Sequence, residues 1–414
     1  MVRSRKKSNT GNNVSISQVQ GITVEFAKSI DEFHDLWVRI MPQSNLFFHP
    51  DYLSALEKSP PIGVKFGYLL FKKDDVLVGG AILQVQYFRA NQNIRYDDSE
   101  KVGFFGTMSK FFRNLVASRV EFHTLVCGSM LLTGEHGFYF KEGVFEENEQ
   151  LEILDNGLSY AYQEFEKQGI QIAGNLLKDF FNSNHQYSNK LTNFGYHEFQ
   201  VQPNMILHNV AWRWENFDDY LQSVTSKYRV RYKRARKKSN SISRRALTLE
   251  EMMEYRDRMY ELYNEVADNS GFNLVNLNKE YLIALKRSMP NRFKVTGYFE
   301  EENLVGYITT LNNGDELEAH FLGFEKRLIR SAQLYLNMLY DILAEGIEGR
   351  YESIVYARTA MEIKSSLGAE GHDMHCYLKH QNTFTNRLLP SILNVLKPEK
   401  EWEPRNPFKK QIDS

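Results

Sequence analysis

The stretch Glu316 to Phe324, with the sequence ELEAHFLGF, places acidic and imidazole side chains at alternate positions. Alternate side chains of a β-strand point to the same face, so we expect Glu316, Glu318 and His320 to share one face. A carboxylate and a histidine at this spacing are suited to proton transfer as general acid or base. Glu318 and His320 are therefore the candidate catalytic residues. The alternative is that they form the solvent-facing side of an ordinary sheet.

A second group of residues is suited to binding an anion. Ten Lys and Arg side chains and no acidic residue lie between Lys227 and Arg245, although the whole chain has a net charge of -1. Because these cations repel one another unless something neutralises them, the segment predicts a phosphate-bearing or otherwise anionic partner. CoA, a nucleotide-linked precursor, tRNA and anionic lipid all fit this description, and a solvated helix face is the alternative.

Smaller groups add candidate substrate contacts. Arg358 and Lys364 follow an expected short strand, where they can contact a carboxylate or phosphate, or else serve as a helix cap and surface charges. His49, Asp51 and Tyr52 stand at the start of an expected helix, on the substrate side, unless Asp51 only caps that helix.

Several kinds of chemistry lack support in the sequence. His372 and Cys376 would lie on the strand face opposite to His375, so we predict no metal site. Only two cysteines occur, Cys127 and Cys376, which is too few for a disulfide framework. Motifs of serine hydrolases and of nucleotide-binding loops are absent from the sequence.

An internal repeat predicts the helices and strands that position these residues. The sequence YLSALEKS from Tyr52 recurs as YLIALKRS from Tyr281, and each copy continues into two apolar strands joined by a charged tight turn. The interval between the copies barely changes from the helix to the second strand. Each copy goes on with strand and helix patterns, and the last helix of each ends at a glycine, Gly195 or Gly368. The predicted fold class is α/β (α+β), with two tandem units, each a mixed, mostly antiparallel sheet flanked by helices.

These patterns divide the chain. Residues 1–20 are predicted to be a disordered N-terminal tail and 21–209 a first domain, with a loop-rich insertion near 94–147. Residues 210–390 form the second domain, which opens with a basic helix at 218–238, and 391–414 form a C-terminal tail. The N-terminus is basic but lacks an apolar signal sequence, and no apolar stretch is long enough to span a membrane. We therefore expect a cytoplasmic protein, with the inner membrane face as a peripheral location.

The order of elements and several motifs resemble the Fem family of peptidyltransferases and the FemAB-like N-acyltransferases of the GNAT superfamily. The motif LFFHPDYLSALE from Leu46 resembles the family's substrate-side helix, and SKYRVRYKRARKK from Ser226 resembles its basic helix. ARTAMEIKSSLGA from Ala357 resembles the family's Arg-Ser/Thr and Lys-x-x-x-Gly-Ala ending. The resemblance covers nearly the whole chain, and it implies tandem GNAT-like domains. It also implies contacts to the acceptor from Lys227, Arg229 and Lys233.

The chain departs from GNAT enzymes at the turn that binds the donor pyrophosphate. GNAT enzymes hold the phosphates on a glycine-rich turn at a helix N-terminus, whereas this chain has FEKRLIRSAQLYL from Phe324, without glycine. We expect Lys326, Arg327 and Arg330 to bind phosphate through their side chains instead. Acyl-CoA and aminoacyl-tRNA therefore remain open as the donor.

The resemblance implies an acyltransferase without a covalent enzyme intermediate and without a tightly bound cofactor, whose co-substrate is acyl-CoA or aminoacyl-tRNA. The acceptor would be an amine on a small or lipid-linked anionic molecule, in peptidoglycan or lipid biosynthesis. The alternative is a non-catalytic GNAT-fold protein that binds nucleic acid, such as tRNA, or an anionic membrane through its basic helix.

Overall fold

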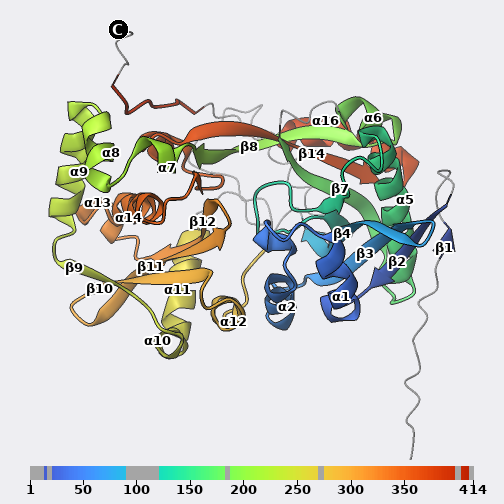
Figure 1. Cartoon of the computed structure of the whole chain (residues 1–414), viewed down its shortest axis with the longest axis horizontal. Coiled ribbons are helices and arrows are strands. Elements are labelled where there is room, and N and C mark those ends of the chain that lie inside the picture. The colour runs from blue at the N-terminus through green and yellow to red at the C-terminus, as the bar shows by residue number, and fades with distance from the viewer. Residues whose placement is uncertain are drawn as a thin grey trace, which may run out of the picture.

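The internal repeat folds as two similar units in the computed structural model, which describes residues 14–15, 21–89, 121–181, 187–268, 275–396 and 402–409. Strands of both units join in one 14-stranded sheet (Figure 1). Along this sheet the strand order is β1-β2-β3-β4-β5-β7-β14-β8-β13-β12-β11-β10-β9, and β6 pairs with β4. Only β5 with β7 and β12 with β13 are parallel pairs among the described strands, so the sheet is mixed and mostly antiparallel, as predicted.

The first unit contains both predicted strands of its hairpin and the helix before them. Its elements are β1 (Val14–Ser15), β2 (Ile22–Ala27), α1 (Ile30–Ile40), η1 (Leu46–Phe48), α2 (Pro50–Lys58), β3 (Lys65–Lys73), β4 (Val76–Arg89), β5 (Glu121–Cys127), β6 (Phe138–Phe140), α5 (Glu147–Glu166), β7 (Ile172–Phe181), α6 (Tyr187–Asn193) and β8 (His197–Leu207). A capping box at Ser29 starts α1, and Pro50 occupies the first turn of α2.

The second unit repeats this plan. Its elements are α7 (Val210–Arg213), α8 (Phe217–Ser223), α9 (Ser226–Lys238), β9 (Ile242–Ala246), α10 (Leu249–Glu254), α11 (Arg256–Ala267), α12 (Tyr281–Ser288), β10 (Phe293–Glu300), β11 (Asn303–Asn313), β12 (Glu316–Phe324), α13 (Leu328–Ser331), α14 (Leu334–Glu348), β13 (Ser353–Val355), α15 (Met361–Ser365), β14 (Glu370–His380) and α16 (Thr383–Leu396). The predicted boundary after residue 209 falls between β8 and α7.

The two units exchange their last strands. β14, the last strand of the second unit, pairs with β7 and β8 of the first unit, and β8 in turn pairs with β13 of the second. β7 and β8 of the first unit are therefore separated by a strand of the other unit. Figure 1 shows β8 and β14 along the top of the view, running between the units.

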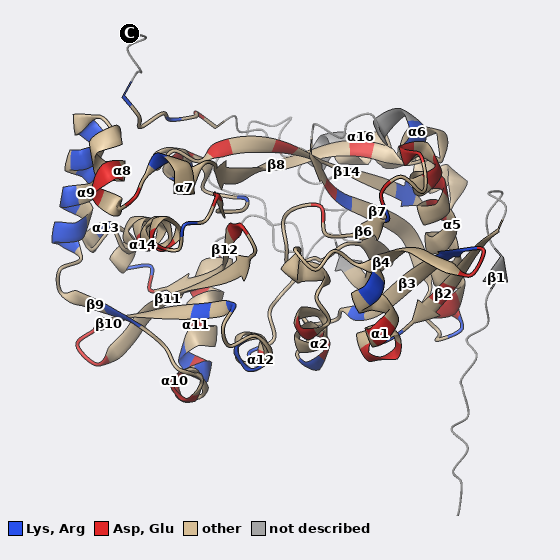
Figure 2. Cartoon of the chain, in the orientation of Figure 1, with Lys and Arg blue, Asp and Glu red and all other residues tan. Residues whose placement is uncertain are grey.

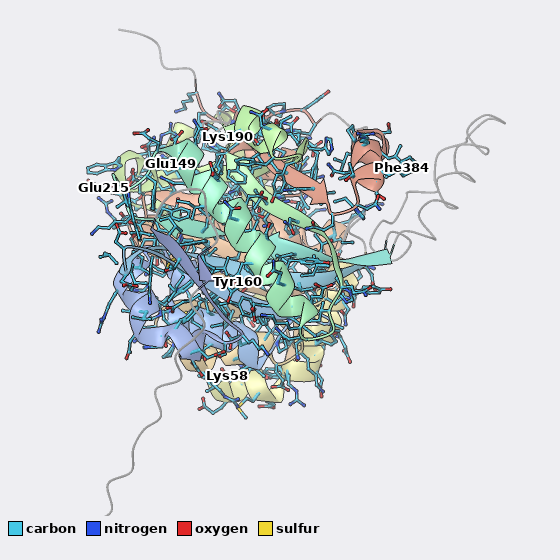
Figure 3. The ribbon with its side chains drawn as sticks, turned by 90° about the vertical axis from the view of Figure 1, so that its right-hand side faces the viewer. Lys58, Glu149, Tyr160, Lys190, Glu215 and Phe384 are labelled. Carbon is cyan, nitrogen blue, oxygen red and sulfur yellow. The ribbon has the colours of Figure 1, made fainter. Side chains whose placement is uncertain are left out.

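Helices cover both faces of this sheet. The core under α5 combines Leu154 and Leu158 with Phe71 of β3, and Figure 3 shows α5 lying across the first unit between the labelled Glu149 and Tyr160. In the second unit, α14 packs on one face through Leu339 and Leu343. On the other face, α1, α2, α10, α11 and α12 share one apolar core that belongs to both units. The helices α2 and α12, which carry the repeated motif, lie against each other there.

Three expectations need correction. The region predicted as a loop-rich insertion at 94–147 contains the strands β5 and β6, although residues 90–120 lie outside the described part. The helix predicted at 218–238 is two helices, α8 and α9, because Val224 and Thr225 between them are not helical. Val224 forms a bridge with Phe408, and the Thr225 N–H donates to the Pro407 carbonyl at 2.9 Å.

The segment predicted as a C-terminal tail at 391–414 is also partly structured. α16 continues to Leu396, and the Phe408 ring in the described residues 402–409 packs near those of Trp214 and Tyr220. Of the predicted N-terminal tail, only residues 14–15 are described, and they form β1. Within the described part of the chain, no helix is both long and apolar enough to cross a lipid bilayer.

The strand exchange predicts that neither unit is stable alone. Residues 21–209 produced as a fragment would lack β14, so β7 and β8 would lose the strand between them and expose unpaired backbone groups. We expect this fragment to aggregate, and to become soluble when it is co-produced with residues 210–414. Size-exclusion chromatography measures both outcomes. A monomeric 21–209 fragment with a cooperative thermal transition would contradict the exchange.

Candidate functional site

The parallel strands β12 and β13 separate after Glu318, which is one of the two candidate catalytic residues. Their parallel ladder joins Glu316 to Glu318 with Ser353 to Val355, and β12 then continues to Phe324 without β13 beside it. A bulge follows directly in the pairing of β12 with β11. The Thr309 hydroxyl stabilises the bulge, since it accepts from the Phe321 N–H and donates to the Phe321 carbonyl, both at 2.8 Å. His320 lies within this bulge.

His320 is held by tyrosines from both units. The hydroxyl of Tyr281, on α12, lies 2.8 Å from His320 Nε2, and the hydroxyl of Tyr52, on α2, lies 3.4 Å from that of Tyr281. Tyr52 and Tyr281 are fully buried, whereas His320 is partly exposed. The two tyrosines occupy the same position in the repeated motif, so each unit supplies one equivalent hydroxyl.

The pKa of His320 sets the charge of its ring, and the direction of these hydrogen bonds sets its tautomer. Burial lowers its pKa to about 3, so the ring is neutral at pH 7. In one of the two possible directions, His320 Nε2–H donates to the Tyr281 hydroxyl and Tyr281 donates to Tyr52. In that arrangement Nδ1 carries the free lone pair of the imidazole. His320 can then accept a proton through Nδ1.

Glu318 occupies the last position of the ladder and is buried. Burial raises its pKa well above the usual range, and the nearby Glu316 adds to this, while a hydrogen bond with Asn313 opposes it. Burial also raises the pKa of Tyr52, whose surroundings include the charge of Glu318. The raised pKa favours the protonated form of Glu318, which can donate a hydrogen bond. The shared face of Glu318 and His320 stays a prediction, because the bulge interrupts the strand alternation between Ala319 and Leu322.

A second polar cluster links the units beside the exchanged strands. Asp179, at the end of β7, is fully buried and forms ion pairs with Lys178 and with Arg358 from the second unit. The Gly134 N–H also donates to it, at 3.3 Å. Although burial alone would raise the pKa of Asp179, the two cations hold it below its usual value. Two cations thus share one carboxylate in this cluster.

The loop after β13 is strained. Ala357, Thr359 and Ala360 all have positive φ values in the left-handed region, which non-glycine residues rarely adopt. The buried Lys364 holds the loop, because its Nζ donates to the carbonyls of Ala357 and Arg358 at 3.1 and 2.6 Å. Burial lowers the pKa of Lys364 to about 7. Strain of this kind is typical of functional sites, and here it aims Arg358 at the first unit.

Aromatic contacts connect the two clusters. The rings of Tyr52 and Phe47 lie 5.3 Å apart, and those of Phe47 and His136 lie 4.6 Å apart. Burial lowers the pKa of His136 to about 4, and the Lys178 charge contributes to this shift. The candidate site is therefore a continuous band of polar and aromatic side chains between the units, from His320 to Arg358.

The other predicted residues lie outside this band. Arg327 pairs with Glu300 at 2.7 Å and with Glu325 at 2.6 Å. The backbone N–H of Lys326 donates to Glu265, and the carbonyl of Arg330 accepts from Lys238. The proposed phosphate contacts of these three residues stay predictions, and Arg327 would have to leave its carboxylate partners to make one.

The predicted substrate contacts on α9 and at the start of α2 differ in their exposure and in their hydrogen-bond partners. Arg229 donates to the Val224 carbonyl at 2.6 Å, at the end of α8, while Lys227 and Lys233 are exposed. His49, rather than Asp51, caps α2, because its Nδ1 accepts from the Asp51 N–H at 3.2 Å. Of the three predicted residues at this helix start, only Tyr52 reaches the candidate site.

His372, His375 and Cys376 do not come together, and among the described residues no group of three or more His, Cys, Asp or Glu side chains could hold a metal ion. His372 faces His208, with 2.9 Å between their Nε2 atoms. His375 pairs with Glu198 at 2.5 Å, and Cys376 lies 3.7 Å from Asp179. The three residues therefore have different partners.

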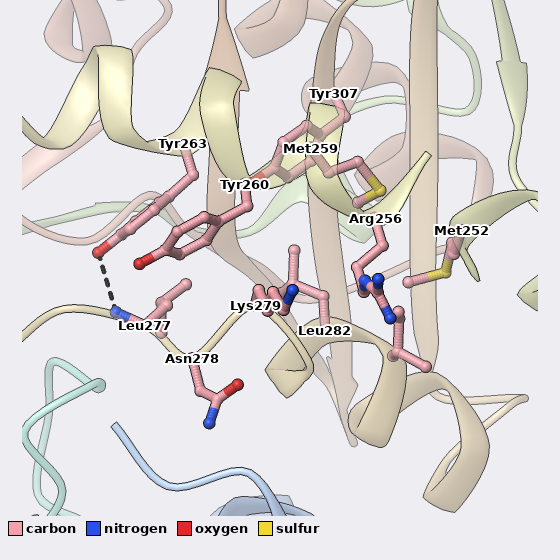
Figure 4. A pocket seen from close by; sticks show the side chains of 11 residues that line it. Met252, Arg256, Met259, Tyr260, Tyr263, Leu277, Asn278, Lys279, Leu282 and Tyr307 are labelled. Atoms are coloured by element: carbon pink, nitrogen blue, oxygen red, sulfur yellow. Dashed lines mark hydrogen bonds between the residues drawn. The ribbon is translucent and has the colours of Figure 1, made fainter. Parts of the chain in front are cut away.

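A small cavity lies next to the site under α11 and α12 (Figure 4). It has a volume of about 20 Å³, and Met259, Tyr263, Leu282 and Tyr307 are among its lining residues. The buried Tyr307 hydroxyl has no partner among the described residues. Because about one water molecule fits a space of this size, the cavity is too small for an acyl chain.

Several residues of the site were not predicted from the sequence, among them Tyr281, Lys178 and Asp179. Tyr281 could have been found, since the repeat aligns it with Tyr52, which had been singled out. No such signal marks Lys178 and Asp179, because the sequence LLKDFF around them is typical of an apolar strand that carries two polar residues. Their importance arises from Arg358, which is distant in the sequence.

The fold is similar to those of two solved structures. A crystal structure of FemX matches with a TM-score of 0.51 at 11% identity, covering 88% of this chain and 99% of that one. A tandem GNAT protein from the clavulanic acid biosynthesis pathway gives a TM-score of 0.50 at 12% identity, covering 87% of this chain and 99% of that one. No protein-family model and no curated protein matches the sequence. The likeness shows a tandem GNAT fold and confirms the predicted fold class.

The Asp179 cluster gives a stability prediction. Asp179→Asn would leave Lys178 and Arg358 without their carboxylate, and breaking a buried ion pair costs about 3–5 kcal/mol. Because the pKa of Asp179 is lowered in the folded protein, its contribution is present above pH 3.8 and is lost as the pH falls through the lowered value. Urea unfolding at pH 7 measures the loss. The exposed Asp35→Asn is the matched control, and equal stability of both variants would contradict the role of Asp179.

Proposed function

We propose that the protein is an N-acyltransferase. It transfers an acyl or aminoacyl group from a carrier, of the acyl-CoA type or aminoacyl-tRNA, to an amine of an anionic acceptor related to the cell envelope or to lipids. One observation carries the proposal, namely the partly exposed His320 at the point where β12 and β13 part, with its Nε2 bound to Tyr281. The tandem GNAT fold supports it, and one similar structure is described as a form without AcCoA.

The transfer needs a proton acceptor of modest strength. The amine attacks the carbonyl carbon of the donor, a C–N bond forms, and the carbonyl electron pair moves to oxygen. The attacking nitrogen becomes cationic and more acidic than a free ammonium group, and the neutral His320 is placed to take its proton at Nδ1. The C=O bond then re-forms, the C–S or C–O bond to the carrier breaks, and the leaving group takes the proton.

Glu318 complements His320 in this scheme. Burial raises its pKa, and in its protonated form the carboxyl can donate a hydrogen bond to the oxygen that becomes negative during the attack. An acid and a base whose pKa values are moved in opposite directions are a frequent arrangement in enzyme sites. We therefore assign His320 as the base and Glu318 as the hydrogen-bond donor, with Tyr281 as the residue that positions His320.

The second cluster supports an anionic substrate. Lys178 and Arg358 share the single carboxylate of Asp179, and the Nε of Arg358 is buried without a partner among the described residues. A phosphate or carboxylate of the acceptor would complete the charge balance there. No tightly bound cofactor is needed for this reaction, because the carrier supplies the activated acyl group.

The proposal is tested first by donor binding. A ligand at 100 times its Kd stabilises the protein by about 2.7 kcal/mol, so a thermal-shift panel with acetyl-CoA, long-chain acyl-CoA and aminoacyl-tRNA should identify one donor. With that donor, His320→Ala is expected to lower kcat by about 10²–10⁴-fold without a change of Tm. Tyr281→Phe should have a smaller effect on kcat. If no donor stabilises the protein, the non-catalytic binding function is favoured instead.

The role of Glu318 predicts a pH dependence. Its raised pKa means that the protonated form is present below that value, so activity should fall as the pH rises through it. Glu318→Gln keeps a hydrogen-bond donor and is expected to keep most of the activity while losing this alkaline fall. Glu318→Ala should be impaired at every pH. If the alkaline fall persists in Glu318→Gln, another group causes it.

A further inference from the structure

The outer face of α9 is a strip of exposed cations around one apolar residue. Lys227, Lys233, Arg234 and Lys237 are exposed, and the exposed Val230, at 63%, lies among them. We call these five residues the α9 face. Figure 2 shows the Lys and Arg residues gathered along this helix, at the left edge of the molecule.

Three other cations of the same segment have carboxylate partners. Arg236 and Arg244 both pair with Asp341, at 2.7 and 2.8 Å, and Arg245 pairs with Glu251. Arg229 donates to the Val224 carbonyl. Arg236, Arg244 and Arg245 are therefore compensated by carboxylates of the body of the protein.

The α9 face differs in this respect. In the part of the chain that the structure describes, none of its four cations forms a salt bridge, and Lys227 only lies over the ring of the adjacent Tyr228, at 5.5 Å. The helix has no acidic residue to separate these charges. Because like charges on neighbouring turns destabilise a helix, an uncompensated strip of this kind indicates a partner that supplies the negative charge.

The character of the side chains favours a lipid surface over RNA. Three of the four cations are lysines, and the exposed apolar groups nearby are aliphatic. These are Val230 on the face itself and Ile329, exposed at 44%, on α13, which a hydrogen bond from Lys238 to the Arg330 carbonyl connects to α9. RNA sites instead use aromatic rings and arginine to stack on bases. Cations that surround aliphatic side chains fit anionic headgroups and the acyl boundary below them.

We infer that the α9 face docks the protein on an anionic membrane surface. The helix runs from Ser226 to Lys238, several turns in all, so its four cations are spread along its length and can contact several headgroups at once. The inference goes beyond the proposed transferase activity and does not depend on it. It would place the protein next to acceptors that are carried in a membrane.

Sedimentation with vesicles tests this inference on the full chain. Wild-type protein should bind vesicles of phosphatidylcholine and phosphatidylglycerol mixed two to one, and should bind pure phosphatidylcholine vesicles far less. Each cation near the surface contributes roughly fivefold in affinity, so Lys233→Gln, Arg234→Gln and Lys237→Gln together should weaken binding by about 100-fold. When Val230→Ser is added to these three changes, binding should weaken by a further several-fold, because an inserted aliphatic side chain is lost.

A control variant removes the same number of charges elsewhere. Arg39→Gln, Lys58→Gln and Lys65→Gln change three exposed cations of the first unit and should leave vesicle binding unchanged. Thermal melting of both triple variants checks that they fold. His320→Ala should bind vesicles as the wild type does, so a failure of the catalytic proposal stays distinguishable from a failure of docking.

Three results would overturn the inference. These are equal binding to vesicles with and without phosphatidylglycerol, equal loss of binding in the two triple variants, and unchanged binding when the α9 face is neutralised. If the protein instead bound a transfer RNA through the same three residues and ignored the vesicles, the partner would be a nucleic acid and the membrane would be excluded.

Discussion

The need to pair every buried backbone group is the constraint on which the rest of this structure depends. β7 and β8 of the first unit are not neighbours, and β14 of the second unit fills the space between them. Because unpaired N–H and C=O groups are costly when buried, this exchange fixes the position of the two units relative to each other. It also brings α2 and α12 together, so that Tyr52 and Tyr281 meet. The candidate site is thus a consequence of how the sheet closes.

The same constraint explains why charges are buried between the units. Arg358 leaves a strained loop of the second unit to reach Asp179 of the first, and Lys364 holds the loop carbonyls. Buried ion pairs add little to stability compared with apolar packing, but removing one partner is costly. A cluster of this kind therefore favours one arrangement of the units over others more than it stabilises the fold. Any ligand anion at Arg358 would act on the same contact.

How much of this could be predicted from the sequence depends on whether the signal is local. The repeat from Tyr52 and Tyr281 is local, and it gave the fold class correctly. The strand exchange is not local, because β14 has the same pattern whichever unit it joins. The break at Val224 depends on Phe408, and the importance of Asp179 depends on Arg358. Such pairs across long separations leave no pattern in either segment.

The two units differ at the place where the two parallel strands of each unit separate. These strands are β5 and β7 in the first unit and β12 and β13 in the second. In the first unit, the chain after β5 occupies this position, since Lys178 donates to the Leu132 carbonyl and the Phe181 N–H donates to Glu135, both at 2.8 Å. In the second unit, β12 continues past Glu318 without β13 beside it. A duplicated fold would otherwise offer two equivalent positions. The first unit therefore contributes Tyr52 and the Asp179 cluster as supports, and the second contributes the open strand with His320, so the pair of units forms one site.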